Sequence, residues 1–231
     1  MKRKFITALC VVLSLLIFAL PVMASTEPTV QESGFNQKTF SEDTVITEDN
    51  VNDILKYFGL DPGNIIKKDN MPNIKVTVRD IEKTLKESSK LPKTIIQNDS
   101  NPTDVKVKTD VLGAKSSGTA TVCKNVKITS ALYMNYYATG QYYHEGSTKY
   151  WTSAGPARLE VATPPTALGF YQLDSVTTLT NQVVNPYTSS SYLRMDYCYA
   201  VGYYMYVGVG YILINSIGVS GYTTFGTSYI P

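Results

Sequence analysis

Apolar residues recur at two different spacings along the chain, and the spacing changes near Gly118. Before that point they recur every three or four residues, as on one face of a helix. Val51, Ile54, Leu55 and Phe58 form the first such face. We therefore predict a short amphipathic helix over these residues.

Capping signals mark the ends of this helix and of a second one. Thr47 is a suitable N-cap for the first helix, and Gly59 is a suitable stop. Thr77 and Asp80 have the spacing of a capping box at the start of the second helix. The second helix has an apolar face at the same spacing, formed by Val78, Ile81 and Leu85.

Residues 43–92 are thus predicted to form a helical hairpin, with a turn at 61–63. Its core is small for a free-standing unit, so we expect it to dock on the C-terminal region or to be held by a partner. Residues 93–118 are polar and are predicted to be a linker. This linker could include a strand at Val105–Val111, where apolar and charged residues alternate.

From Thr119 onward, apolar and polar residues alternate, which is the period of a strand with one buried face. The alternation is clearest over Thr119–Thr129 and Tyr192–Val209. Turn residues separate roughly seven such runs. We predict a mainly β fold class in which residues 119–231 form a tyrosine-rich antiparallel β-sandwich; a jelly-roll and an immunoglobulin-like topology both remain open.

The N-terminus has the order of a cleavable signal peptide. Lys2, Arg3 and Lys4 precede the apolar run Phe5–Leu20, and Val22-Met23-Ala24 is a small-x-small site. We predict that residues 1–24 are removed after Ala24 and that the protein is secreted. An uncleaved N-terminal anchor is the alternative. Residues 25–42 lack periodicity and are predicted to be a flexible leader.

Charge and tyrosine are distributed unevenly along the chain. The chain has 21 basic and 19 acidic residues, and removal of the signal peptide leaves a net charge of −1. No electrostatic attraction to nucleic acid or to an anionic membrane is expected. Seventeen of the 18 tyrosines lie from Tyr133 onward, which supports a division into two structural units.

Two cysteines remain after the signal peptide is removed, Cys123 and Cys198. An even pair in an oxidising compartment suggests a disulfide. Both residues fall on the polar parity of their strands, which disfavours a bridge through the core between two sheets. A bridge between near neighbours in one sheet and two thiols therefore both remain open.

The residues needed for metal binding and catalysis are scarce. His144 is the only histidine, and no Cys-x-x-Cys or Gly-x-Ser-x-Gly motif is present. A Cys123–His144 pair is conceivable, but outward-facing cysteines of β-strands are more often structural. The β region offers four acids for glycoside hydrolysis: Glu145, Glu160, Asp174 and Asp196. We predict no cofactor and no metal, and keep a secreted hydrolase as an alternative.

Aromatic residues crowd the chain around a turn at Gly146-Ser147. Tyrosine and tryptophan have flat apolar faces with a polar edge, which suits stacking on sugars and recognition of proteins. They also simply fill half-buried sheets. Adjacent residues of a strand face opposite ways, so one of each adjacent pair should be exposed. The candidate ligand-binding residues are Tyr142, Tyr143, His144, Tyr150 and Trp151.

The alternative function is membrane attack by a pore-forming or bacteriocin-like secreted toxin. Thr177–Thr180 and Val219–Ser228 are rich in serine and threonine and free of charge, as in strands that insert into membranes as hairpins. A membrane partner is expected only in that case. The preferred hypothesis is a secreted, non-enzymatic binding protein that recognises glycan or protein, such as cell-wall glycan or a surface protein, at or near a bacterial cell surface.

Overall fold

The computed structural model describes residues 39–98, 104–109 and 115–231. The predicted signal peptide (1–24) and most of the predicted leader (25–42) lie outside these residues. The last residues of the leader are described, and they are held in place: the Glu42 carboxylate accepts a hydrogen bond of 2.9 Å from Arg79 Nε.

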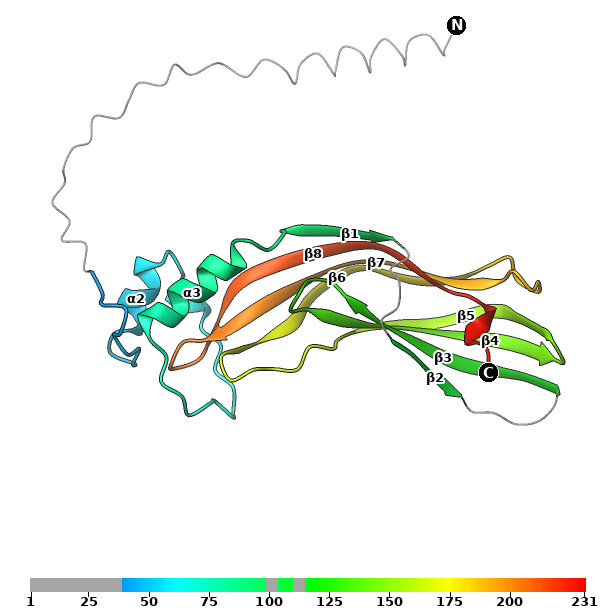
Figure 1. Cartoon of the computed structure of the whole chain (residues 1–231), viewed down its shortest axis with the longest axis horizontal. Helices are drawn as coiled ribbons and strands as arrows, with labels where there is room; N and C mark the ends of the chain where they lie inside the picture. The colour runs from blue at the N-terminus through cyan, green and yellow to red at the C-terminus, as the bar shows by residue number, and fades with distance from the viewer. Residues whose placement is uncertain (1–38, 99–103, 110–114) are drawn as a thin grey trace, which may run out of the picture. The chain divides into compact units, whose positions relative to one another are not determined.

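The structure is mainly β, as predicted, with two four-stranded sheets and few helices (Figure 1). One sheet contains, in spatial order, β1 (Thr94–Asn98), β8 (Tyr211–Phe225), β7 (Tyr192–Tyr206) and β6 (Gly169–Val184). The other contains β2 (Asp104–Thr109), β3 (Lys115–Lys127), β4 (Tyr133–Glu145) and β5 (Thr148–Val161). All neighbouring strands are antiparallel except β1, which pairs with β8 in parallel.

The parallel strand β1 lies in the segment that we expected to be a polar linker. Residues 93–118 contain β1, β2 and the start of β3, so this segment belongs to the sheets. Ile95 packs against the core, whereas Ile96 is 76% exposed. A five-residue strand with one inward apolar residue has too little periodicity to be recognised, and its pairing with β8 determines its conformation.

Inward-facing residues of both sheets share one apolar core. The predicted parity is confirmed along β3 and the first part of β7, because Val122 and Val126 of β3 and Leu193 and Met195 of β7 are buried while Cys123 is not. It was wrong beyond Val201, where the β7–β8 register shifts and Tyr204 is buried while Tyr203 is only half-buried. Tyrosines contribute to this core: the hydroxyl groups of Tyr136 and Tyr199 lie 2.7 Å apart between the sheets. Burial raises the pKa of both tyrosines far above its ordinary value.

Two short helices lie where the spacing of apolar residues placed them, α2 (Val51–Tyr57) and α3 (Val78–Ser88). The capping box of α3 is confirmed, because the Asp80 carboxylate accepts a hydrogen bond of 2.8 Å from the Thr77 amide. The predicted cap of α2 was wrong. Asn50 is its N-cap residue, and the Asn50 side chain accepts a hydrogen bond from the Thr47 amide.

The segment between the helices docks on the β7–β8 end of the first sheet. It contains the 3₁₀ helix η1 (Pro62–Asn64) and a β-bridge in which Ile66 and Tyr211 exchange hydrogen bonds of 2.7 and 2.8 Å. The helices and the sheet share a second apolar cluster that includes Ile54, Ile81 and Met205. The sheet thus supplies the support that two short helices lack.

Candidate functional site

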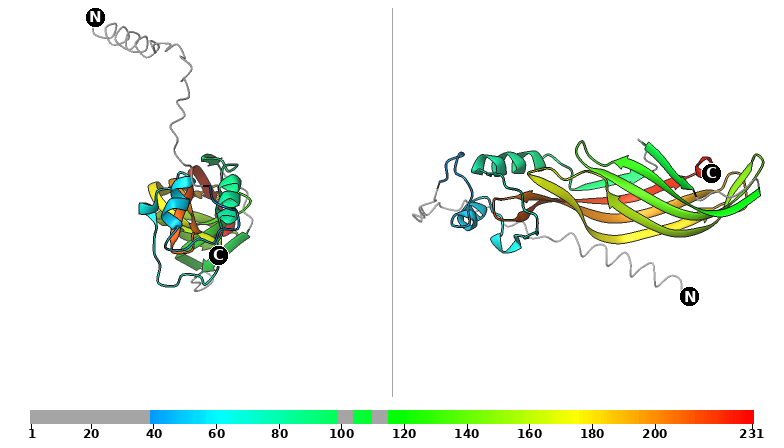
Figure 2. Two further views of the ribbon diagram at one scale, coloured as in Figure 1. Left: turned by 90° about the vertical axis from the view of Figure 1, so that its left-hand side faces the viewer. Right: turned by 90° about the horizontal axis from the view of Figure 1, so that it is seen from below.

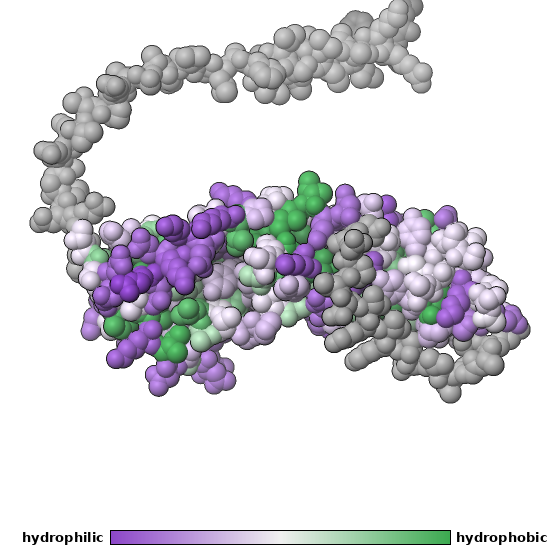
Figure 3. Space-filling view, in the orientation of Figure 1, coloured by the Kyte–Doolittle hydropathy of each residue, from purple (hydrophilic) through white to green (hydrophobic). Residues whose placement is uncertain are grey.

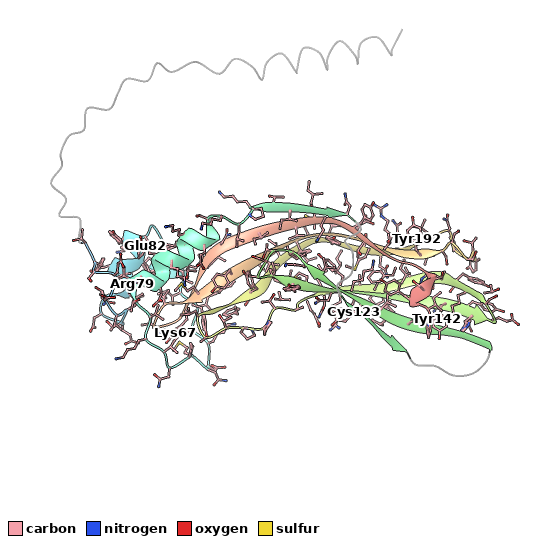
Figure 4. The ribbon with its side chains drawn as sticks, viewed as in Figure 1. Lys67, Arg79, Glu82, Cys123, Tyr142 and Tyr192 are labelled. Atoms are coloured by element: carbon pink, nitrogen blue, oxygen red, sulfur yellow. The ribbon has the colours of Figure 1, made fainter. Side chains whose placement is uncertain are left out.

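The five candidate ligand-binding residues separate according to the face of the sheet on which they lie. Tyr142 is 2% exposed and Trp151 is fully buried, so neither is accessible to a ligand. Tyr143, His144 and Tyr150 are partly exposed. The placement of Tyr142 and Trp151 in a ligand site was therefore wrong. The inner faces of β4 and β5 bury both side chains, and Figure 4 shows Tyr142 at the end of the sheet, beside the 3₁₀ helix η2 (Thr227–Tyr229).

Trp151 holds this end of the two sheets together. Its ring packs edge-on against Tyr142 with 6.4 Å between the ring centroids. The indole Nε1 donates a hydrogen bond of 3.2 Å to the Gly226 carbonyl, and the backbone amide of Trp151 donates one of 2.7 Å to Ser191 Oγ. A buried indole usually has such a partner. Trp151 is thus a structural anchor of the hairpin.

Three partly or largely exposed tyrosines gather on the outside of this hairpin. Tyr143 and Tyr150 are cross-strand partners on β4 and β5, and their rings stack with centroids 5.0 Å apart and planes 16° apart. Tyr187 comes from the β6–β7 connection, is 68% exposed and meets Tyr150 edge-on at 6.1 Å. We call Tyr143, Tyr150 and Tyr187 the tyrosine tip.

The contribution of Tyr187 was not foreseen from the sequence. It follows the Asn185-Pro186 turn, and both Asn185 and Tyr187 have positive φ angles, of 51° and 63°. This conformation is uncommon for residues other than glycine. The Tyr187 amide donates a hydrogen bond of 3.2 Å to the Trp151 carbonyl, which fixes the turn against β5. A turn, and not a repeat of apolar residues, places Tyr187 at the tip, so the spacing of apolar residues could not predict it.

The polar groups around the tyrosine tip are already engaged within the protein. The Tyr143 hydroxyl donates a hydrogen bond to the Glu145 carboxylate, which raises the pKa of Tyr143 above its usual value. His144 Nε2 lies 3.0 Å from the Gly146 carbonyl, which can only accept, so Nε2 carries the hydrogen. Lys149 Nζ donates to the Ile230 carbonyl at 2.9 Å. The tip therefore presents aromatic rings, and the charged groups Glu145 and Lys149 beside it are hydrogen-bonded within the chain.

The structure does not assemble the conceivable Cys–His pair. Cys123 is the cross-strand partner of Tyr137, and His144 lies seven residues further along β4. At about 3.3 Å per residue, this separates them by about 23 Å. Cys123 and Cys198 lie in different sheets and are not joined by a disulfide.

The four candidate acids lie on separate strands, and each interacts with a neighbouring side chain. Glu145 accepts a hydrogen bond from Tyr143, Glu160 pairs with Arg158, Asp174 accepts from the Tyr204 hydroxyl at 2.9 Å, and Asp196 pairs with Arg194 at 2.8 Å. Within residues 39–98, 104–109 and 115–231, no three His, Cys, Asp or Glu side chains are grouped to hold a metal ion.

The two segments considered for membrane insertion lie on either side of β7. Thr177–Thr180 belongs to β6 at the edge of the first sheet, and most of Val219–Ser228 belongs to β8. With β7 between them, they are not the two arms of one hairpin. None of the helices in the described part of the chain is both long enough and apolar enough to cross a membrane.

Comparison with known proteins gives no relative: no protein family, no curated protein and no solved structure matches this chain.

Proposed function

We propose that this is a secreted, non-enzymatic binding protein that recognises a glycan at or near a bacterial cell surface through the tyrosine tip. The observation that carries the proposal is the set of three partly or largely exposed rings, Tyr143, Tyr150 and Tyr187, drawn from three parts of the chain. Tyrosine rings offer large, rigid contact area with little loss of side-chain entropy on binding.

Among the described side chains, the charged groups beside the tip are bonded within the chain, which favours an uncharged glycan over a charged protein surface. Glu145, His144 and Lys149 all have hydrogen-bond partners within the chain. In Figure 3 the surface at this end of the sheets, outside the grey residues, is mostly pale, as tyrosine, serine and threonine are on this scale. Sugar rings have apolar faces that can lie on such rings, while their hydroxyl groups remain in water.

The scaffold suits a rigid site. We infer that the two sheets form a β-sandwich, with the helical segment closing one end and the tyrosine tip at the other. Figures 1 and 2 place α3 and the turn between β4 and β5 at opposite ends of the sheets. On the opposite face of the same strands, Tyr142 and Trp151 are packed in the core. This packing fixes the position of the strands that carry Tyr143 and Tyr150.

Retention of the purified protein on isolated bacterial cell walls tests this function. We expect the double substitution Tyr150→Ala and Tyr187→Ala to weaken retention by at least about tenfold, or about 1.4 kcal/mol of binding free energy. Tyr57→Ala is the matched control, because Tyr57 is 44% exposed but lies on α2. Far-UV circular dichroism confirms that each variant is folded.

Treatment of the walls separates the two ligand classes. Periodate, which destroys vicinal diols of sugars, should abolish retention, whereas protease treatment of the walls should leave it unchanged. The reverse result would assign the tip to a surface protein instead. Equal retention of the wild type, the tip variant and the Tyr57 control would refute the role of the tip.

A further inference from the structure

A groove of about 880 Å³ lies at the end of the sheets opposite to the tyrosine tip, between α3 and the segment that leads into β6. The β3–β4 turn, at Ser130 and Ala131, forms part of its rim. Figures 1 and 2 show α3 and the start of β6 side by side at this end. A cavity of this size is typical of a ligand-binding site.

The floor of the groove is apolar and aromatic. Tyr171 and Tyr203 are cross-strand partners on β6 and β7, with ring centroids 5.0 Å apart. The next residue, Phe170, stacks on Tyr204 and is covered by Lys68 Nζ at 3.4 Å, so its ring is not part of the open floor. Burial raises the pKa of both tyrosines, so both hydroxyl groups stay neutral at physiological pH. Leu168 is 38% exposed at the edge of this floor.

One wall of the groove is the charged face of α3. Lys83 and Glu87 both line the groove, are exposed and lie one helical turn apart. Lys90 continues the alternation of sign beyond the helix. Asp80, the other acid in the lining, is occupied by the capping box with Thr77. The wall therefore presents both signs of charge in a fixed order and attracts neither a polyanion nor an anionic membrane as a whole.

Three of the seven hydroxyl groups that line the groove are hydrogen-bonded within the protein. Thr163 Oγ1 accepts a hydrogen bond of 2.7 Å from the Tyr133 amide and donates to the Ala131 carbonyl. Thr166 Oγ1 donates to the Gly169 carbonyl at 3.0 Å, and Ser88 Oγ donates to the Leu85 carbonyl at 2.9 Å. A glycan needs a dense set of polar partners, whereas most of the surface that lines this groove is apolar.

We propose that this groove binds an amphipathic peptide segment of a partner protein. The apolar side chains of the segment lie on Leu168, Tyr171 and Tyr203. Its charged side chains face α3, with an acidic residue opposite Lys83 and a basic residue opposite Glu87. The groove is separate from the tyrosine tip, and its peptide ligand does not depend on what the tip binds.

Selection from a phage-displayed library of random 12-residue peptides on the immobilised protein tests the proposal. We expect enriched peptides that combine apolar residues with both acidic and basic residues. Leu168→Asp should weaken their binding at least about tenfold, because it places a charge on the apolar floor. Leu168 is exposed enough for this change to leave the fold intact, and Tyr187→Ala at the tip is the matched control.

A charge swap tests the order of charges on the wall. The double variant Lys83→Glu and Glu87→Lys keeps an opposite pair one turn apart on α3 and so preserves the helix. It should bind the selected peptides at least about tenfold more weakly and prefer peptides with the opposite order of charges. Failure to enrich any peptide sensitive to Leu168→Asp would overturn the proposal. So would groove-dependent binding of chitin oligosaccharides or phosphatidylglycerol vesicles in place of peptides.

Discussion

The hydrogen bond between the Tyr136 and Tyr199 hydroxyl groups gives a quantitative test of the packing between the two sheets. The two oxygens are 2.7 Å apart, and both side chains are almost fully buried. Tyr136→Phe removes one hydroxyl and takes from the Tyr199 hydroxyl its side-chain hydrogen-bond partner. An unsatisfied buried group of this kind costs about 1–3 kcal/mol. We expect this loss in the free energy of unfolding for Tyr136→Phe and a smaller loss for Tyr199→Phe, because the Tyr136 hydroxyl then keeps its interaction with Tyr197.

The double variant distinguishes a hydrogen bond from mere packing. With both hydroxyls replaced by apolar rings of the same shape, no group is left unsatisfied, and the change can be nearly neutral. The double variant should therefore lose less stability than the sum of the two single variants. Tyr136→Phe combined with Tyr206→Phe is the control, because the Tyr206 hydroxyl donates to Gly208 in the other apolar cluster and the two effects should add.

Urea denaturation of the wild type, the three single variants (Tyr136→Phe, Tyr199→Phe and Tyr206→Phe) and the two double variants measures these quantities, with thermal melts as a second readout. A loss of 1 kcal/mol should lower the midpoint of a chain of this size by about 2–4 °C. Additive losses for Tyr136 and Tyr199, or no loss in either single variant, would refute the assignment of a hydrogen bond between the sheets.

Three further predictions follow from side chains described above. Trp151→Ala should cost about 3–5 kcal/mol of stability, because it removes a fully buried ring, so any loss of binding should accompany loss of the thermal transition. Burial raises the pKa of Tyr137 and of Tyr204 to about 12, and hydrogen bonds to Glu160 and Asp174 add to this increase. The folded state therefore keeps protons that the unfolded state releases near pH 10. The free energy of unfolding should fall as the pH rises from about 10 to 12, and urea titrations at several pH values would detect this. Alkylation of the unreduced, denatured protein should label both Cys123 and Cys198, because they lie on the outward faces of different sheets and are not bridged, and an unlabelled pair in the mass spectrum would contradict this.

The features that were predictable from the sequence are those fixed by local pattern. The capping box at Thr77 and Asp80 needs only the spacing of two residues, and it is present. The alternation along β3, and along β7 as far as Val201, likewise identified which residues face the core. The parallel pairing of β1 was not predictable, because it depends on Gly221, a residue far along the chain. A Cβ atom there would lie 1.9 Å from the Gln97 carbonyl oxygen.

In the candidate site, too, local pattern predicted some features, whereas contacts between distant parts of the chain determine the others. Alternation required one of Tyr142 and Tyr143 to be exposed, but it did not say which one. The facing of Trp151 depends on irregular pairing between β4 and β5, where the register shifts twice. Tyr187 reaches the site through a turn with positive φ angles. Each of these placements depends on contacts that form only when the sheets assemble.

The parallel pairing of β1 with β8 also constrains the order of events during folding. Thr94 is the partner of Gly218, so this pairing closes a loop that contains most of both sheets. Contacts between residues so far apart in sequence form slowly, because chain entropy must be lost first. The edge of the first sheet therefore stays open until β8 has been synthesised. A nascent chain cannot complete this sheet early, and a chain that crosses a membrane during synthesis would reach the far side with its fold still unfinished.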